Sequence, residues 1–335
     1  MTEQLPVAID VMGGDNAPEA LIEGALLAVD RHDLPVLLVG DPETISDRVG
    51  SRTENVSVKP ASEVIEMHAE PASSVRKLRD SSVVRTMEAV RDGEACAALS
   101  AGNTGAAMAS SLLRLGRIKG VSRPAIAGPF PVLGSTPTTI LDIGANADCQ
   151  PEWLRQFAIL GSVYATTRFK IERPRVGVLT IGEEAGKGNA LVKETVDLLR
   201  EPEWAESVGA DYVGNVEASD LLAGAADVIV CDGFTGNVVL KTLEGFNSSY
   251  AAAMRTELKK DPEAERTASP LLEPLWETYN SGNIGSAMLL GTRGVTMISH
   301  GSATSENISN AVKTAKQLDS EGVVSNLRQA IGATG

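Results

Sequence analysis

Residues 5–15 read LPVAIDVMGGD, an apolar run that ends in two glycines and an aspartate. An amphipathic pattern follows over 19–30, with Ile22, Leu26 and Val29 on one stripe. A buried strand, a glycine-rich turn and a helix in this order form the repeating unit of α/β proteins with parallel sheets. The stretch therefore predicts a strand over 5–11 and a polar turn at its carboxyl end.

Eight further apolar runs have the same character, and amphipathic segments such as 189–200 and 237–259 lie between them. This alternation predicts an α/β fold with a mostly parallel sheet and helices on both faces. We expect the nine strands at 5–11, 35–40, 56–60, 95–100, 138–143, 175–181, 211–216, 226–231 and 295–299.

Neither an internal repeat nor a linker divides the chain, so we expect residues 1–335 to form a single α/β catalytic unit. The one shift in composition lies at 258–274, where KKDPE is followed by SPLLEP. We interpret this part, around 245–290, as an excursion from the main fold. It is either helical and mobile or a solvated loop.

The 335 residues include 30 Lys and Arg against 44 Asp and Glu, a net charge of −14. This acidic total argues against a nucleic-acid-binding protein, which needs a basic field to meet phosphates. Three well-separated cysteines and an amino-terminal region without an apolar leader favour a cytoplasmic location. The cysteines and the three histidines lack zinc-ligand spacing, and no known nucleotide-binding motif is complete. We expect no metal and no cofactor.

The strongest pattern is a polar turn, rich in glycine and asparagine, after strand upon strand. Glycines let backbone N–H groups approach an anion, and helix amino termini add partial positive charge. Any one such turn is explained by ordinary caps, but a series of six favours an anionic ligand in a shared cleft. The candidate phosphate-binding residues are Asp10, Gly13, Gly14, Asp15, Ser100, Gly102, Asn103, Thr104, Gly105, Asp142, Asn146, Gly188 and Gly236.

Residues 76–123 stand out by charge, because they hold nine basic and four acidic residues, a local balance of 9 − 4 = +5. This segment is either a solvated face or a surface that docks an acidic partner.

Taken in order, these motifs resemble the bacterial phosphate acyltransferase family from about residue 7 to residue 316. The resemblance rests on DVMGGD at 10–15, DSS at 80–82, SAGNTG at 100–105, RPA at 123–125, LDIGAN at 141–146, QFA at 156–158, GEE at 182–184, CDGFTGN at 231–237 and HG at 300–301. It implies an enzyme that makes acyl phosphate from acyl-acyl carrier protein and inorganic phosphate, the first step toward phosphatidic acid.

The resemblance also implies a fold similar to that of isocitrate and isopropylmalate dehydrogenases, with a cleft between two lobes. It implies a homodimer formed through a helical region, peripheral membrane contact and hand-off of the product to a membrane glycerol-3-phosphate acyltransferase. For the basic segment it implies docking of acyl carrier protein on Arg76, Arg79 and Arg85.

Phosphate is already a nucleophilic anion and a thiolate leaves readily, so the implied reaction needs positioning and charge neutralisation more than acid–base groups. We predict that Lys187 holds phosphate or stabilises the oxyanion, and that Asn237 fixes the thioester carbonyl. Asp232 is expected to orient Lys187 or Lys241, as is Asp10.

His300 follows an apolar strand and is either catalytic or a capped core histidine. Two other reactions stay open as alternatives. One is phosphotransacetylase chemistry with acyl-coenzyme A, and the other is metal- and NAD-dependent decarboxylating dehydrogenation on the same fold.

Overall fold

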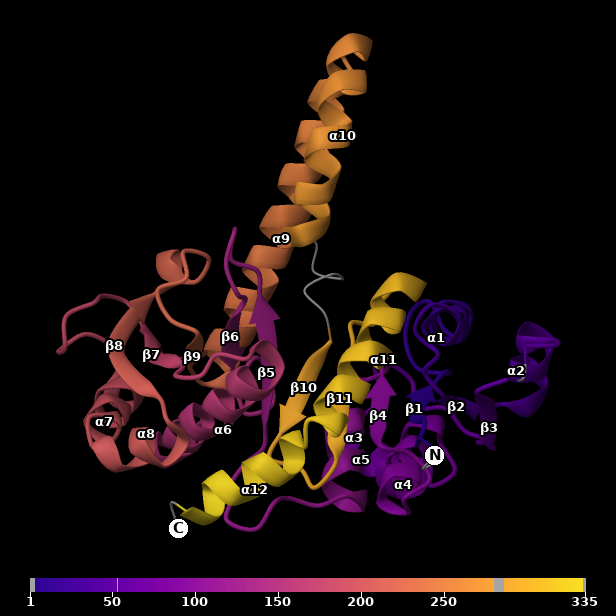
Figure 1. Cartoon of the computed structure of the whole chain (residues 1–335), viewed down its shortest axis with the longest axis horizontal. Coiled ribbons are helices and arrows are strands. Elements are labelled where there is room, and N and C mark those ends of the chain that lie inside the picture. Colours follow the sequence, from indigo (N-terminus) through magenta and orange to yellow (C-terminus); the bar gives the residue numbers. More distant parts are fainter. Residues whose placement is uncertain (1–3, 53, 280–285, 334–335) are drawn as a thin grey trace.

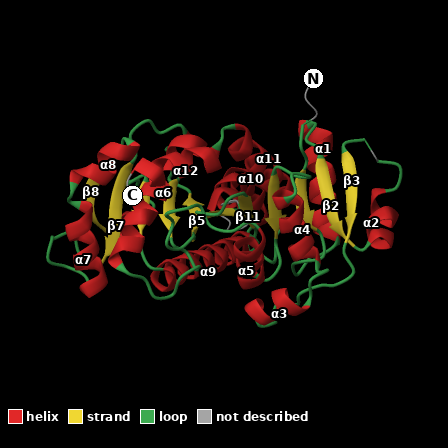
Figure 2. Cartoon of the chain, turned by 90° about the horizontal axis from the view of Figure 1, so that it is seen from below, coloured by secondary structure: helices red, strands yellow, loops and turns green. Residues whose placement is uncertain are grey.

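The computed structural model describes residues 4–52, 54–279 and 286–333. Its centre is an 11-stranded sheet with helices on both faces (Figures 1 and 2). The strands are β1 (Val7–Asp10), β2 (Val36–Gly40), β3 (Val56–Pro60), β4 (Ala97–Ser100), β5 (Ala125–Phe130), β6 (Thr138–Leu141), β7 (Arg175–Thr180), β8 (Asp211–Glu217), β9 (Val228–Val230), β10 (Ala287–Leu290) and β11 (Val295–Ile298). Their order across the sheet is β3-β2-β1-β4-β11-β10-β5-β6-β9-β7-β8.

Helices lie between most of the strands, as the sequence predicts. They are α1 (Glu19–His32), α2 (Pro42–Val49), α3 (Pro71–Lys77), α4 (Ser82–Arg91), α5 (Thr104–Arg114), α6 (Pro151–Phe169), α7 (Ala190–Leu199), α8 (Pro202–Val208), α9 (Gly233–Leu258), α10 (Pro262–Tyr279), α11 (Ser305–Ser320) and α12 (Val323–Ala333). The α/β class and the mostly parallel sheet are confirmed, and each of the nine expected runs contains a strand.

Two strands that the sequence did not indicate, β5 and β10, reverse the direction of the sheet at its centre. β10 pairs antiparallel with both β11 and β5, and β5 pairs antiparallel with β6. The other neighbouring pairs are parallel. The β1–β4–β11 half therefore runs opposite to the β6–β9–β7 half.

Both halves nevertheless end near the same place on the central strands. Ile298, the last residue of β11, pairs with Ala287 of β10. Asp142, which follows β6, accepts a hydrogen bond from the N–H of Ile126, and Ile126 pairs with Leu289 of β10. Only two residues of β10, about 7 Å of strand, separate the two ends. The loops of both halves can therefore line one cavity.

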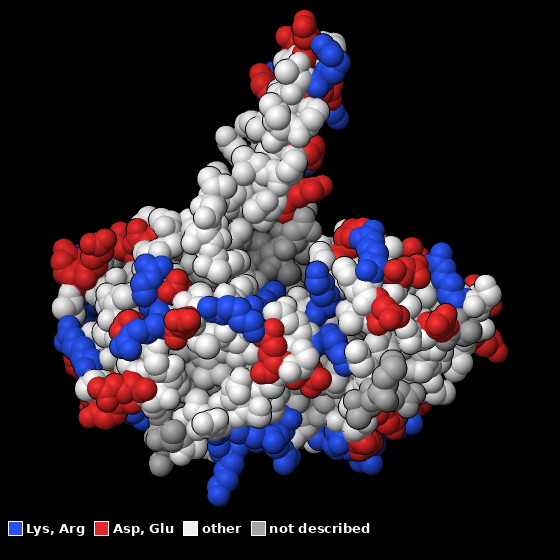
Figure 3. All heavy atoms as spheres, viewed as in Figure 1, with Lys and Arg blue, Asp and Glu red and all other residues white. Residues whose placement is uncertain are grey.

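Helices α9 and α10 form an antiparallel hairpin that projects from the body (Figure 1). Its shaft shows few charged side chains on the face drawn in Figure 3, and charges gather at its tip. The excursion expected around 245–290 is thus helical over most of its length, while 280–285 lie outside the described residues. Within the described part of the chain, no helix combines the length and the apolar character needed to span a bilayer.

Candidate functional site

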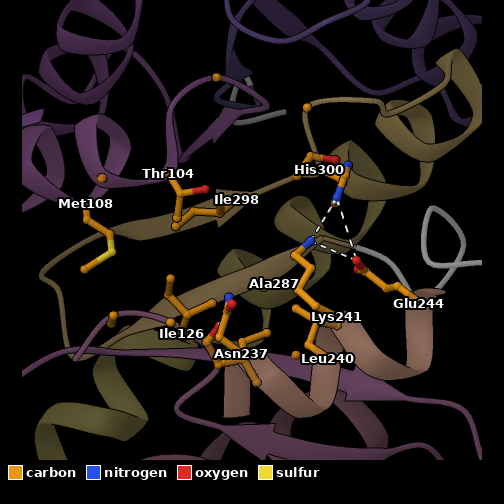
Figure 4. A pocket seen from close by; sticks show the side chains of 18 of the residues that line it. Thr104, Met108, Ile126, Asn237, Leu240, Lys241, Glu244, Ala287, Ile298 and His300 are labelled. Atoms are coloured by element: carbon orange, nitrogen blue, oxygen red, sulfur yellow. Dashed lines mark hydrogen bonds and ion pairs between the residues drawn. The ribbon is translucent and has the colours of Figure 1, made fainter. Parts of the chain in front are cut away.

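A cavity of about 530 Å³ lies where the two halves of the sheet meet (Figure 4). One half contributes the loops after β1, β4 and β11, and the other contributes the segment after β6 and the first turns of α9. The strands β5 and β10 lie between them. Its lining consists of Asp15, Met67, Gly102, Thr104, Gly105, Met108, Ile126, Gly128, Pro129, Phe130, Ile143, Gly144, Ala145, Asn237, Leu240, Lys241, Glu244, Ala287, Ile298, Ser299, His300 and Gly301.

Helix α9 brings three polar side chains to one wall of this cavity. Asn237, Lys241 and Glu244 are spaced by four and three residues, so they share one face of the helix. The helix begins at Asp232, whose carboxylate accepts hydrogen bonds from the backbone N–H of Thr235 at 2.8 Å and from its hydroxyl at 2.8 Å. Asp232 therefore acts as the N-cap that fixes the start of this wall.

Lys241, Glu244 and His300 form a trio at the edge of the cavity (Figure 4). The Lys241 Nζ atom lies 2.8 Å from Glu244 Oε2 and 3.1 Å from His300 Nε2. His300 Nε2 and Glu244 Oε2 are 3.9 Å apart. The Lys241 and His300 side chains are 50% and 42% exposed, whereas Glu244 is 15% exposed. The cation and the ring can thus be reached from solvent while the carboxylate lies behind them.

Both ring nitrogens of His300 have polar partners. A lysine ammonium has donors and no acceptor, so His300 Nε2 accepts from Lys241. On the other side of the ring, Nδ1 lies 2.7 Å from the Ser302 hydroxyl oxygen and 3.3 Å from the Ser302 backbone nitrogen. His300 is exposed and lines the cavity, so the core position is wrong, and a catalytic role stays a prediction.

In the loops of the first half, two glycine backbones lie in close contact. A Cβ on Gly13 would lie 2.9 Å from the Cα of Gly102 and 2.6 Å from a carboxylate oxygen of Asp10. The same Asp10 oxygen accepts a 2.7 Å hydrogen bond from the Ser100 hydroxyl. Burial raises the pKa of Asp10, against the opposing effect of its hydrogen bonds. The Asp10 carboxylate, held by Ser100, thus packs against the loop at the point where the two glycine backbones meet.

The next two loop residues differ in position, because Asp15 lines the cavity and Gly14 lies outside its lining. The backbone N–H of Asp15 donates to the Gly301 carbonyl oxygen at 2.8 Å, which ties the loop after β1 to the loop after β11. Gly14 has a φ of +124°, a left-handed conformation that glycine adopts without strain. Asp15 itself lines the cavity.

Asp142 organises the loop of the second half. One carboxylate oxygen accepts from the N–H groups of Ile126, Gly144 and Ala145 at 2.9–3.1 Å. The other accepts from the backbone N–H and the side-chain amide of Asn146, at 2.7 and 2.9 Å. Burial raises the pKa of Asp142. The structure places both Asp142 and Asn146 behind the lining residues Gly144 and Ala145.

The first turn of α9 packs tightly on this loop. A Cβ on Gly236 would lie 1.9 Å from the Asp142 carbonyl oxygen, so only glycine fits there. The Asn237 amide donates to the Ile143 carbonyl oxygen at 3.2 Å. Gly236 thus allows the approach that brings Asn237 to the cavity.

Asn103 joins helix α5 to the rim of the cavity. Its side-chain oxygen accepts from the N–H of Ala106 at 3.0 Å and caps α5. Its amide donates to the carbonyl oxygens of Met67 and Ala69, at 2.9 and 3.0 Å. Its neighbours Gly102, Thr104 and Gly105 line the cavity, and Asn103 holds them in place.

Lys187 and Gly188 lie outside the cavity lining. They belong to the loop after β7, and β9 separates that strand from β6. The Lys187 side chain is 50% exposed, and its Nζ lies 3.9 Å from Glu184 Oε2. The structure therefore brings Asn237, Lys241 and His300 together and leaves Lys187 apart from them.

The basic segment divides between two regions. Arg76 and Arg79 are exposed at the end of α3, the helix that packs beside the start of α5. Arg85, in α4, lies 3.1 Å from Asp80 and 3.1 Å from Glu88. Arg91 and Arg114 are at the far ends of α4 and α5, away from the cavity loops.

Sequence reasoning gave Glu244 no role in the site and did not find the apolar part of the lining. Glu244 lies three residues after Lys241 in a segment that was expected to be helical, so helical spacing alone would have placed it beside the lysine. Helical spacing would also have placed Met108 on the same helix face as Thr104, because it lies four residues later. Ile126, Gly128 and Phe130 lie on the unpredicted strand β5.

The described residues give no sign of a metal centre or a cysteine nucleophile. Among residues 4–52, 54–279 and 286–333, no three His, Cys, Asp or Glu side chains gather as metal ligands. Burial raises the pKa of the Cys149 thiol to about 12, and that of the buried Cys231 thiol also lies well above its ordinary value.

Solved structures with this fold include a phosphotransacetylase from Streptococcus pyogenes, with a TM-score of 0.60 at 15% identity over 96% of both chains. A 4-hydroxythreonine-4-phosphate dehydrogenase from Klebsiella pneumoniae has a TM-score of 0.52 at 12% identity, covering 95% of this chain and 98% of that chain. Likeness at such identities shows the fold alone.

Sequence comparisons are far more specific. A family model described as "Fatty acid synthesis protein" matches residues 5–326. The phosphate acyltransferase of Pelotomaculum thermopropionicum is 42% identical over 332 residues, which cover 98% of this chain and 95% of that protein. The phosphate acyltransferase of Trichodesmium erythraeum is 42% identical over 317 residues, covering 93% and 92%. With both the family model and these relatives matching nearly its whole length, the chain belongs to the phosphate acyltransferase family, a family of acyl-transferring enzymes.

Proposed function

We propose that this cavity catalyses transfer of an acyl group from acyl-acyl carrier protein to inorganic phosphate. The observation that carries the proposal is the Lys241–His300 pair beside glycine backbones, at the edge of a cavity whose remaining walls are largely apolar. A lysine cation suits a phosphate, and an apolar wall suits an acyl chain.

In the proposed reaction, an oxygen of phosphate attacks the thioester carbonyl carbon. A tetrahedral intermediate forms, the carbon–sulfur bond breaks, and the carrier leaves as a thiolate that takes up the proton released from the phosphate. The products are acyl phosphate and the free thiol of the carrier. The phosphate needs no base to become a nucleophile, so the enzyme supplies mainly position and charge.

Lys241 is proposed to neutralise the phosphate. Its ammonium is already held by Glu244 and His300 and half exposed toward the cavity. Asn237, four residues earlier on the same helix face, is proposed to orient the thioester carbonyl with its amide. His300, whose Nδ1 contacts the Ser302 hydroxyl, is proposed to hold Lys241 in place.

The experiment compares two lysine variants with a matched control. Purified enzyme is given acyl-acyl carrier protein and phosphate, and acyl phosphate is trapped with hydroxylamine. Lys241→Ala should lower kcat/KM by about 100-fold to 1,000-fold, the order of loss found when one group that stabilises charge in the transition state is removed. Lys193→Ala, on the exposed face of α7, should leave it unchanged. Wild-type turnover by Lys241→Ala would refute the role.

The same assay tests the role that the sequence suggests for Lys187, since loss of turnover in Lys187→Ala alone would give the anion site to Lys187. It also separates the alternative reactions. A preference for acyl-coenzyme A over the carrier-linked donor would indicate phosphotransacetylase chemistry. NADH formation from a hydroxy acid would indicate a dehydrogenase.

Docking of the acidic carrier is proposed at the exposed end of α3. Met67, in the loop before α3, lines the cavity, and Asn103 ties that loop to α5. Arg76 and Arg79 are exposed in the segment that follows Met67, whereas Arg85 is paired with two carboxylates. Reversing both exposed charges should raise KM for acyl-acyl carrier protein and not for acyl-coenzyme A. Reversing Arg85 should have the smaller effect on that KM.

The α9–α10 hairpin is proposed to contact a second copy of the chain or a bilayer surface, from which the product would pass to a membrane glycerol-3-phosphate acyltransferase. Large apolar side chains are exposed on it, among them Phe246 at 61% and Leu271 at 75%. Liposome flotation and sedimentation of a variant with polar residues at positions 271 and 272 separate the two contacts. Lost flotation would indicate the bilayer, and a lower oligomeric mass would indicate the second copy.

A further inference from the structure

We propose that Met108 closes the apolar end of the cavity and sets the length of acyl chain that the enzyme accepts. This inference rests on the proposed function and adds a specificity-determining residue to it. The polar trio occupies one end of the cavity, and Figure 4 places the Met108 side chain across the cavity from Lys241 and His300. A thioester held at the trio would thus direct its chain toward Met108.

The wall between these two ends is apolar and smooth. Ile126, Gly128 and Phe130 alternate along β5 and so lie on one face of that strand. Gly128 has no side chain on this face, and a Cβ there would lie 2.6 Å from the Ile143 Cδ1 atom. The surface between the trio and Met108 therefore offers an acyl chain apolar contact, with no polar group to desolvate along β5.

The size of the cavity suits a chain much longer than acetyl. Its volume of about 530 Å³ also has to hold the phosphate and the carbonyl group. A cavity of about 150 Å³ already binds benzene. Each methylene moved from water into the cavity contributes about 0.8 kcal/mol, which corresponds to roughly fourfold in binding. A difference of two methylenes therefore gives about 15-fold discrimination.

Met108 is placed and built to act as the end wall. It lies on α5 one turn after Thr104, and the Asn103 cap fixes the start of that helix. It packs against the core beneath the cavity but is only partly buried. Methionine is unbranched and adapts its shape to a neighbour, so its volume limits the chain without a polar contact.

Two substitutions at this position should move the preference in opposite directions. The assay measures kcat/KM for a series of saturated acyl-acyl carrier proteins that increase by two carbons. Met108→Ala should raise kcat/KM for the chain two carbons longer than the wild-type optimum, relative to kcat/KM for the optimum itself, by about 10-fold. Met108→Phe should lower the same ratio by a similar factor. KM for phosphate should stay unchanged in both. Met108→Leu keeps the volume and should keep the optimum.

Met254→Ala, on α9 outside the cavity lining, is the matched control and should not shift the optimum. An unchanged optimum in both Met108→Ala and Met108→Phe would overturn the inference, as would shifts in the same direction. If the wild-type enzyme made no acyl phosphate from any donor, the proposed function would fail on its own. Binding of free fatty acids by calorimetry would then still test Met108, because the alanine variant should favour longer chains than the wild type.

Discussion

Replacing Asp142 by asparagine tests whether a buried carboxylate, rather than a ligand contact, shapes the second half of the site. The side chain is 0% exposed and accepts five N–H groups, three on one oxygen and two on the other. Asparagine keeps the shape and one acceptor, but its amide group must take the place of one oxygen. The variant therefore changes the hydrogen bonding and leaves the packing intact.

The magnitude follows from the oxygen that is lost. With the amide placed toward Asn146, the backbone N–H and the side-chain amide of Asn146 both face a donor instead of an acceptor. A buried donor left without a partner costs about 1–3 kcal/mol. Because both Asn146 donors are only partly buried, the two together should cost about 1–3 kcal/mol, against the 5–15 kcal/mol by which proteins are usually stable.

The assay is urea unfolding of Asp142→Asn beside wild type and Asp148→Asn. Asp148 lies six residues further on and is exposed, so its substitution should change the free energy of unfolding by less than about 0.5 kcal/mol. The Asp142 variant should also lose turnover, since Gly144 and Asn237 depend on this loop. A loss below 1 kcal/mol for Asp142→Asn, with turnover retained, would refute the reasoning.

Three further outcomes are expected. Gly236→Ala should prevent folding, because its Cβ would lie 1.9 Å from a carbonyl oxygen. Gly245→Ala has open space around it and should stabilise α9 by up to about 1 kcal/mol. Circular dichroism and melting temperatures test both variants. Burial raises the pKa of Asp142 above its ordinary 3.8, so the folded state keeps this proton at a pH where the unfolded state has released it. The stability of wild type relative to Asp142→Asn should increase as the pH falls through the raised pKa toward 3.8, and urea midpoints over that pH range measure it. Asn103→Asp should keep the cap of α5 but lose the amide donors to Met67 and Ala69, so helix content should persist while kcat/KM falls.

The elements that the sequence predicts are those with a local signal. Nine strands and the helices between them follow from short apolar runs and helical periodicity. The exceptions, β5 and β10, have weaker local signals, since AIAGPF contains a glycine and a proline and AMLL has only four residues. Their pairing depends on partners far away in the chain, and their antiparallel direction decides which loops meet. Lys187 was expected at a shared cleft, but its loop follows β7, which β9 separates from β6, so the loop lies further along the edge of the sheet.

The polar loop residues show why residue type alone predicts a site only in part. A turn at the end of a buried strand leaves backbone N–H groups without partners, and a short carboxylate or amide nearby is the simplest way to satisfy them. Asp142, Asn103 and Asp232 all do this. Their side chains face the backbone for the same reason that makes them common in such turns. What faces the cavity is therefore the glycine backbone that they hold in place, together with residues of a helix face. The spacing of Asn237, Lys241 and Glu244 predicts that these three side chains point to the same side of a helix, because helical periodicity fixes the direction of each side chain. The composition of a turn does not fix the direction of its side chains.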